Sequence, residues 1–222
     1  MTTLSTPIQV ALCVRSEDTP FASAVACSLL PIPAGFFDLP TSLRGRKVNE
    51  CCENDPSWKQ LLPYVVALDD SGDIFAYTRG KAGAEGRLHG NISIGLGGHV
   101  DLPPEAGQPL ESHLVAEANR ELDEEACLPP AHLKFEGLIC DPTNEVGQVH
   151  IGLLSIRQVS ASEKEAMMAE AGVVEKGMFV TLDYLLQPDV FERLENWSKC
   201  AVLHIAQMRG AAPVSQKDPV AA

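Results

Sequence analysis

Apolar runs separated by turn-forming residues predict β-strands in the middle of the chain. The run 61–68 and the run 74–79 flank the polar segment Asp69–Asp73, whose aspartates and glycine favour a turn. A third short run, 92–100, contains the pair Gly97-Gly98. These segments predict a strand, a turn, a strand and a further short strand.

An amphipathic helix follows. Apolar residues recur every fourth position on one face, which is typical of a helix packed against a core. They are Leu110, Leu114, Ala118 and Leu122, with Val115 alongside. The other face carries Glu117, Glu121, Glu124 and Glu125. Because residues three and four apart are neighbours on a helix, these carboxylates are predicted to project into one region.

The segments after this helix predict a hairpin and a closing helix. Apolar runs at 133–140 and 148–156 flank the segment 141–147, with a turn expected at 144–147. A helical repeat then predicts one helix from Val190 to Met208 that closes the domain. Its apolar positions are Phe191, Leu194, Trp197, Ala201 and Ile205.

Residues 1–58 are interpreted as an N-terminal extension that packs on the core or forms a dimer interface. Within it, residues 8–14 predict a strand, and the apolar stretch 21–30 ends at Pro31 and Pro33. That stretch is shorter than the roughly 20 apolar residues of a membrane-spanning helix, and it has no basic flank to indicate a secretory signal. The rest of the chain is interpreted as one catalytic domain over 59–209 and a flexible tail over 210–222.

Composition narrows the function classes. The chain has 222 residues and a formal net charge of −13, so no basic surface indicates nucleic-acid binding. Its seven cysteines include no C-x-x-C motif, so neither a disulfide framework nor a zinc site is indicated. We expect a cytoplasmic protein that acts on a small molecule and binds neither nucleic acid nor a membrane.

The segment Arg120–Leu128 carries the candidate chemistry. Glu121, Glu124 and Glu125 lie within five residues, and such crowding of like charges is relieved by a cation. Carboxylate oxygens are ligands for Mg²⁺ or Mn²⁺. The alternative is that these acids form only the solvated face of a surface helix.

This segment resembles the box of the Nudix hydrolases, G-x5-E-x7-R-E-U-x-E-E-x-G-U, in which U is a bulky aliphatic residue. Residues 120–125 fit R-E-U-x-E-E, and Leu128 fits the last U. Cys127 replaces the final glycine and Ser112 replaces the earlier acid, for which Glu105 or Glu111 are alternatives. Gly98 precedes Arg120 by 22 residues, whereas the box has 14, so we infer an eight-residue insertion, 102–109.

The resemblance extends over about 60–187, and the segment 86–99 is similar to a Nudix branch of predicted phosphoesterases. It implies an α/β fold, the Nudix-type α/β/α sandwich with a mixed β-sheet, and a homodimer. The late segment 175–185 resembles the family's late strand and short helix. The box helix is expected on one side of the sheet and the C-terminal helix on the other.

The resemblance also implies a Mg²⁺-dependent hydrolase, with Mn²⁺ as an alternative, that cleaves a pyrophosphate bond in a nucleoside diphosphate derivative or a related organic pyrophosphate. Glu121, Glu124 and Glu125 would hold the metal. Glu121, Glu124 and Arg120 would be catalytic, with Arg120 holding a glutamate in place. Substrate binding would fall to Gly97, Gly98, His99, Arg79 and Arg87.

Several alternatives stay open at this point. The catalytic base is Glu121 or one of the later acids Glu145, Glu170 and Glu175. A second functional hypothesis, motivated by Cys127 and Ser112, is a catalytically weak or inactive Nudix-fold protein with a binding or regulatory role. A third is isomerisation of a prenyl diphosphate, for which Cys127 and Cys140 are no clear counterparts of the proton-transferring cysteine.

Overall fold

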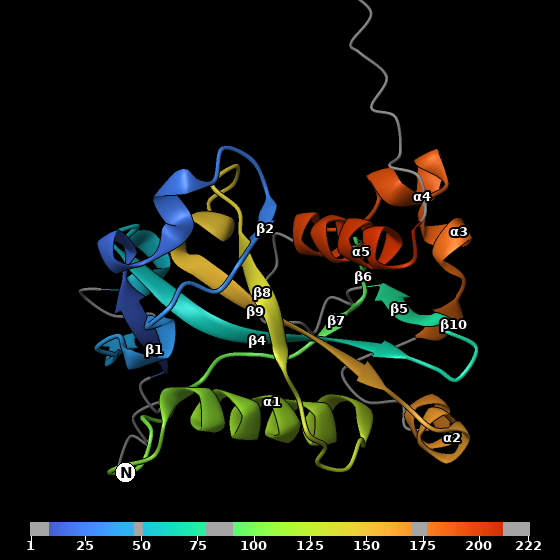
Figure 1. The fold of residues 1–222 in the computed structure, drawn as a ribbon, viewed down its shortest axis with the longest axis horizontal. Helices are drawn as coiled ribbons and strands as arrows, with labels where there is room; N and C mark the ends of the chain where they lie inside the picture. The colour runs from blue at the N-terminus through green and yellow to red at the C-terminus, as the bar shows by residue number, and fades with distance from the viewer. Residues whose placement is uncertain (1–8, 47–50, 79–90, 170–176, 211–222) are drawn as a thin grey trace, which may run out of the picture.

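The computed structural model of the chain describes residues 9–46, 51–78, 91–169 and 177–210. Its centre is a mixed β-sheet that lies between two helical layers (Figure 1). Helix α1 (Leu110–Ala126) crosses one face, and helix α5 (Asn196–Met208) covers the other. The expected α/β/α sandwich, with the box helix and the C-terminal helix on opposite sides, is confirmed.

The main path of the sheet runs β10-β5-β4-β9-β8-β2. These strands are Met178–Val180, Ile74–Thr78, Trp58–Leu68, His150–Gln158, Phe135–Cys140 and Ser28–Leu30. Four further strands are β1 (Val10–Arg15), β3 (Ser42–Gly45), β6 (Ile92–Ser93) and β7 (Gly95–Leu96). The pair β4·β9 is parallel and the other pairs are antiparallel, so the sheet is mixed as expected.

Strand β4 is the centre of the sheet and is buried along almost its whole length. Helices cover both faces there, which explains why 61–68 reads as a continuous apolar run and not as an alternating one. The expected hairpin 133–156 is also present, since β8 pairs with β9 in antiparallel register across the segment 141–149.

Strands β7 and β1 pair with separate stretches of the same edge of β4, and this split positions the site. Strand β7 pairs with β4 through Val65 and Leu96, whereas β1 pairs with it through Cys13 and Gln60. The chain from Gly97 to His99 passes between these two pairings. The N–H of Leu12 then donates to the carbonyl oxygen of Val100 at 2.7 Å, which joins this segment to β1.

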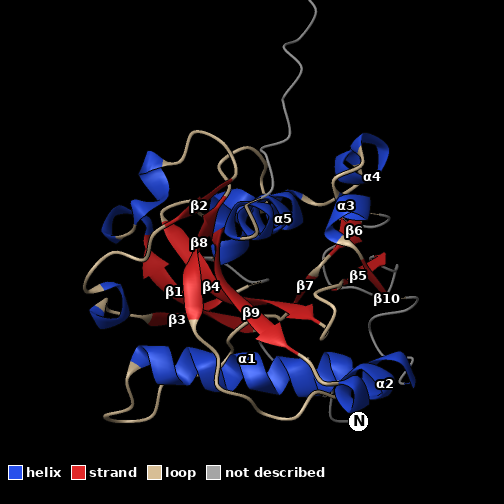
Figure 2. Cartoon of the chain, turned by 45° about the vertical axis from the view of Figure 1, so that its right-hand side comes forward, coloured by secondary structure: helices blue, strands red, loops and turns tan. Residues whose placement is uncertain are grey.

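The remaining helices are short. They are α2 (Ala161–Ala169), α3 (Leu182–Leu185) and α4 (Pro188–Glu192), with 3-10 turns η1 (Ser16–Asp18), η2 (Pro20–Ser23), η3 (Phe36–Asp38), η4 (Cys52–Asn54) and η6 (Gly147–Val149). Strand β10 followed by α3 confirms the expected late strand and short helix. Figure 2 shows α2 beside the C-terminal end of α1.

The prediction of a single helix from Val190 to Met208 is wrong. The structure has α4 and α5, separated by residues 193–195. The N–H of Ile92 donates to Arg193 and the N–H of Glu195 donates to the carbonyl of Ile92, so Leu194 forms a β-bridge with Ile92. This pairing draws the backbone of 193–195 out of helical geometry.

The hydrophobic core has a part on each face of the sheet. The α1 side includes Leu114, Ala118 and Leu122, each 0% exposed, as the apolar period predicts. Residues of the N-terminal region, such as Leu12 and Phe36, join the same cluster. Within the described ranges no helix is long and apolar enough to cross a membrane.

Candidate functional site

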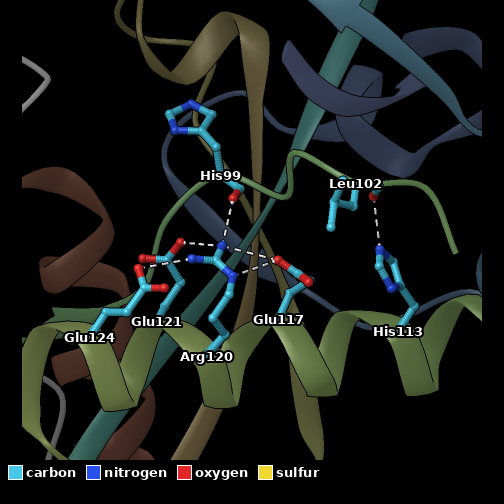
Figure 3. A network of polar contacts seen from close by, with 7 residues as sticks. All are labelled: His99, Leu102, His113, Glu117, Arg120, Glu121 and Glu124. Carbon is cyan, nitrogen blue, oxygen red and sulfur yellow. Dashed lines mark hydrogen bonds and ion pairs between the residues drawn. The ribbon is translucent and has the colours of Figure 1, made fainter. Parts of the chain in front are cut away.

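Arg120 lies at the centre of a group of carboxylates on the face of α1 that meets the loop of His99 (Figure 3). Its Nε donates to Glu117 Oε2 at 3.0 Å and its Nη1 donates to Glu124 Oε2 at 3.0 Å. Its Nη2 donates to Glu121 Oε1 at 2.6 Å. One guanidinium therefore pairs with three glutamates, and not with a single one, because positions 117, 120, 121 and 124 share one helix face. We name this group with Glu125 the acidic cluster.

The acidic cluster is tied to the loop that crosses the split in the sheet. Arg120 Nη2 donates to the carbonyl oxygen of His99 at 3.3 Å. On the next turn of α1, Glu125 Oε2 accepts a hydrogen bond of 2.9 Å from the N–H of Gly97. Helix and loop are thus joined at two points, one through the guanidinium and one through a carboxylate.

The two glycines allow this close approach. Gly97 has a φ of +140°, and a Cβ there would lie 2.2 Å from the carbonyl oxygen of Pro63. A Cβ on Gly98 would lie 2.7 Å from the carboxyl group of Glu121. Position 97 therefore needs glycine, because the backbone of β4 leaves no room, whereas a Cβ at position 98 would displace the carboxyl group of Glu121.

The acidic cluster is strongly negative. Four carboxylates and one guanidinium leave three net negative charges, and the side chains of Glu117 and Glu121 are only 11% and 14% exposed. Burial raises the pKa of Glu121, although the neighbouring Arg120 opposes the shift. Burial acts to lower the pKa of Arg120, but the charge of Glu121 and the hydrogen bonds to Glu124 and Glu117 outweigh it and raise that pKa.

The chemistry of this donor set fits a hard divalent cation, because carboxylate oxygens are the ligands that such ions prefer. The net charge left after Arg120 is counted favours a further cation at the same place. As the side chains stand, Arg120 occupies the space between Glu117 and Glu121 (Figure 3). Across the described ranges, no group of three or more His, Cys, Asp or Glu side chains is arranged to hold a metal ion.

Most of the site residues expected from the sequence lie together. Glu121, Glu124, Glu125 and Arg120 meet Gly97, Gly98 and the backbone of His99. Arg79 and Arg87 lie outside the described residues, as do Glu170 and Glu175. Glu145 is exposed in the segment between β8 and β9, and Glu105 and Glu111 are also exposed.

His99 divides its contacts between two places. Its carbonyl faces Arg120, while its imidazole points away from α1 (Figure 3) and meets the imidazole of His150 with 3.3 Å between the two Nε2 atoms. His150 Nδ1 lies 2.6 Å from the carbonyl oxygen of Val146. Burial, then Arg46 and His150, lower the pKa of His99 to about 2, so the ring is neutral at physiological pH. No local pattern indicates this pair, because the two residues are 51 positions apart.

A buried polar group supports the strand that leads into the glycines. Glu195 is 5% exposed, and its Oε1 accepts hydrogen bonds from Ser93 at 2.6 Å and from Tyr64 at 3.2 Å. Ser198 Oγ accepts from the N–H of Ile94 at 3.1 Å. Sequence reasoning missed this group because it placed Glu195 inside a continuous helix. A polar residue in an apolar helical repeat was the only signal.

Comparison with known proteins adds to this geometry. No model of a protein family matches the chain. Protein YmaB of Bacillus subtilis (strain 168) is 37% identical over 153 residues, which cover 68% of this chain and 72% of YmaB. That identity and coverage show common family membership.

One solved structure shows the fold. The crystal structure of Tm1382, provisionally described as a Nudix hydrolase, superposes with a TM-score of 0.65 at 23% identity, covering 90% of this chain and 100% of Tm1382. The MutT protein from Methanosarcina mazei Go1 gives a TM-score of 0.48 at 14% identity, covering 67% of this chain and 94% of that one. The chain therefore belongs to the same family as YmaB, and it has the fold of Tm1382.

Proposed function

We propose that this protein is a divalent-metal-dependent hydrolase of a pyrophosphate bond in a nucleoside diphosphate derivative or a related organic pyrophosphate. The observation that carries the proposal is the acidic cluster, which holds three net negative charges against the glycine loop. A phosphate-rich substrate brings further negative charge, so a cation has to mediate between the two.

In this proposal Glu121, Glu124 and Glu125 hold Mg²⁺ or Mn²⁺. When bound, such an ion neutralises charge on the pyrophosphate oxygens and lowers the pKa of a water molecule. Arg120 keeps Glu121 and Glu124 in place through its hydrogen bonds of 2.6 and 3.0 Å. Because these side chains are already in position, they need not rearrange when charge develops in the transition state. Such preorganised electrostatic stabilisation is usually the largest contribution to catalysis.

The loop residues would bind the substrate. Gly98 brings its backbone next to the carboxyl group of Glu121 because it has no side chain, and Gly97 precedes it in the same loop. His99 is neutral, so it can offer a hydrogen bond but no charge, and Arg79 and Arg87 would supply positive charge to the phosphates. The catalytic base is Glu121 or a later acid such as Glu145, and substitution of each by Gln, followed by turnover measurements, separates them.

We also propose that the protein works in the cytoplasm as a homodimer on a small molecule, without binding nucleic acid. The formal charge of −13 supports the exclusion of nucleic acid. Light scattering at micromolar concentration tests the dimer, and a monomer mass would remove it.

The decisive experiment is release of phosphate or monophosphate from a panel of nucleotide sugars, dinucleoside polyphosphates and nucleoside triphosphates, with Mg²⁺, with Mn²⁺ and with chelator. Glu124→Gln should abolish activity that depends on the metal. Asp123→Asn is the matched control, because Asp123 is an exposed acid in the same segment whose side chain lies outside the acidic cluster. Equal loss in both variants, or full activity in chelator, would contradict the assignment.

A binding or regulatory protein that has lost turnover is the second candidate. Two departures from the box favour it, Cys127 at the position of the last glycine and Ser112 at the position of the first acid. Isothermal titration with Mg²⁺ or Mn²⁺ distinguishes it from the enzyme. Metal uptake that depends on Glu124, together with no product from any member of the panel, would support the binding protein.

A further inference from the structure

Two sulfur atoms from opposite ends of the chain lie unusually close. Cys27 Sγ and Cys200 Sγ are 2.7 Å apart, although 173 positions separate the residues. Both are free thiols in this structure. Sulfur atoms of two thiols that only touch lie farther apart than this, and a disulfide needs a small further approach to about 2.05 Å.

The surrounding backbone explains the juxtaposition. Cys27 immediately precedes β2, which pairs with β8 at the edge of the sheet. Cys200 lies one turn after Asn196 on α5, and the Cys27 thiol donates to the carbonyl oxygen of Asn196 at 3.3 Å. Asn196 Nδ2 in turn donates to Asp141 Oδ2 at 2.9 Å. The hydrogen bond from Asn196 to Asp141 thus holds the start of α5 beside the end of β8, the partner of β2, without a sulfur atom.

We propose that Cys27 and Cys200 form a redox-active dithiol, a modification site that closes to a disulfide when the protein meets a low-molecular-weight disulfide such as oxidised glutathione. The disulfide would link the residue before β2, in the N-terminal region, covalently to helix α5. It would leave the acidic cluster untouched, since α5 and α1 lie on opposite faces of the sheet (Figure 1).

The exchange balances without any other reactant. The thiolate of Cys27, the more exposed of the two residues, attacks one sulfur of oxidised glutathione and releases one glutathione thiolate. The thiolate of Cys200 then attacks Cys27 Sγ and releases the second glutathione thiolate. Two protons leave the protein thiols and end on the two released glutathiones, and the two electrons of the S–S couple pass from protein to glutathione.

The environment makes this reaction slow at neutral pH. The contact with Cys200, and then burial, raise the pKa of Cys27, so little thiolate is present to start the exchange. The rate should therefore rise with pH. Cys127 is exposed, so glutathione reaches it directly and it should form a mixed disulfide sooner.

Two other pairs of cysteines could form a disulfide instead of Cys27 and Cys200. Cys140 lies in β8 opposite Ser28. Burial, and to a lesser degree the charge of Cys200, raises the pKa of Cys140, so a bond between Cys140 and Cys200 is one alternative. Cys13 and Cys52 are also in contact, since each thiol affects the pKa of the other through a hydrogen bond. Peptide mapping separates all three linkages.

The test is equilibration of the full-length protein with oxidised glutathione at pH 8.5, followed by acid quench, non-reducing digestion and mass spectrometry. A peptide pair joined through Cys27 and Cys200, with the loss of two hydrogen atoms from the intact mass, supports the proposal. Failure of this linkage to form while Cys127 is glutathionylated would overturn it, as would a predominant linkage from Cys140 to Cys200.

Thermal unfolding supplies a second readout. A disulfide that closes so long a loop restricts the unfolded chain, so oxidation should raise the Tm of the wild type by at least about 5 °C. The same rise is expected in Cys127→Ser, the matched control. Oxidised Cys27→Ser and Cys200→Ser should show no rise, and a rise in either of them would assign the effect to another pair.

Discussion

The N–H of Gly97 donates a 2.9 Å hydrogen bond to Glu125 Oε2, and this bond joins the strand-end loop directly to the box helix. Gly97→Ala should break it. The new Cβ would lie 2.2 Å from the carbonyl oxygen of Pro63 at a φ of +140°, so the loop must move. We expect a loss of at least about 3 kcal/mol in the free energy of unfolding, measured by urea denaturation.

Gly107→Ala is the control for that experiment. Gly107 also has a positive φ, +83°, but a Cβ there would meet nothing within 4 Å. Its substitution should cost about 1 kcal/mol from backbone strain alone. If the two variants lost equal stability, the clash with Pro63 would not be the cause.

Cys127 ends α1 in the left-handed conformation, with φ 52° and ψ 35°. The N–H of Cys127 bonds to Asp123 and that of Leu128 bonds to Leu122, which closes the helix. Glycine is the residue best suited to such a position, and this explains the glycine of the box. Cys127→Gly should therefore stabilise the protein by about 0.5–1 kcal/mol in urea denaturation.

Cys127→Ala separates backbone strain from the loss of the thiol. Alanine keeps a Cβ in the left-handed conformation, so the strain stays and stability should remain close to that of the wild type. A gain in the alanine variant equal to the gain with glycine would show that removing the exposed thiol, and not relief of strain, stabilises the chain.

The parts of the fold that local periodicity determines were predictable. The alternation of apolar and acidic residues from 110 to 125 predicted the buried face and the acidic face of α1. The turn residues at 69–73 predicted the β4–β5 hairpin. The break between α4 and α5 was not predictable, because Phe191 and Leu194 fit a helical repeat. Only the pairing of Leu194 with Ile92, far away in the sequence, interrupts it.

The candidate site divides in the same way. Helix geometry predicts that carboxylates three and four residues apart lie on one face, and the pair Gly97-Gly98 predicts a loop beside them. The sequence did not predict that Arg120 pairs with three glutamates at once, because the choice among neighbouring partners depends on side-chain geometry. The contact of His99 with His150 arises from the split edge of β4, which no local pattern encodes.

Ser198 supports the strand segment that enters the site. Its Oγ accepts from the N–H of Ile94 at 3.1 Å and lies 2.8 Å from the hydroxyl of Tyr64. Ser198→Ala leaves a buried N–H without a partner, which should cost about 1–3 kcal/mol in the free energy of unfolding. Ser162→Ala, at an exposed position on α2, should stay within about 0.5 kcal/mol of the wild type in the same measurement. Similar small effects in both would show that the network contributes little.

Lys59 should make stability depend on pH. The residue is 1% exposed, and burial lowers its pKa from 10.5 to about 8. Between these two values the unfolded chain binds more protons than the folded one, so the Lys59 contribution to stability rises with pH across that window. Below pH 8 the full cost of burying the charge is present.

Comparison with Lys59→Met isolates this contribution, because other titrating groups cancel in the difference. The stability of the wild type relative to the variant should increase by roughly 2–3 kcal/mol from pH 8 to pH 10.5. Chemical denaturation at several pH values measures it. A difference that stays constant, or that falls with pH, would mean that the carbonyl oxygens of Pro56 and Gln148 keep Lys59 charged.

Removal of Arg120 should expose the charge imbalance of the acidic cluster. Arg120→Met leaves three glutamates without their guanidinium partner, so we expect a loss of roughly 1–3 kcal/mol at low salt, moderated because the Arg120 side chain is 35% exposed. Millimolar Mg²⁺ should restore part of the lost Tm, and this rise in Tm should exceed that of the wild type because Arg120 no longer competes for the carboxylates.

Lys199→Met is the control. It removes a positive charge on α5, away from the acidic cluster, and its Tm should respond to Mg²⁺ as that of the wild type does. Equal rises in all three proteins would show that the ion acts by general screening and does not bind at the glutamates.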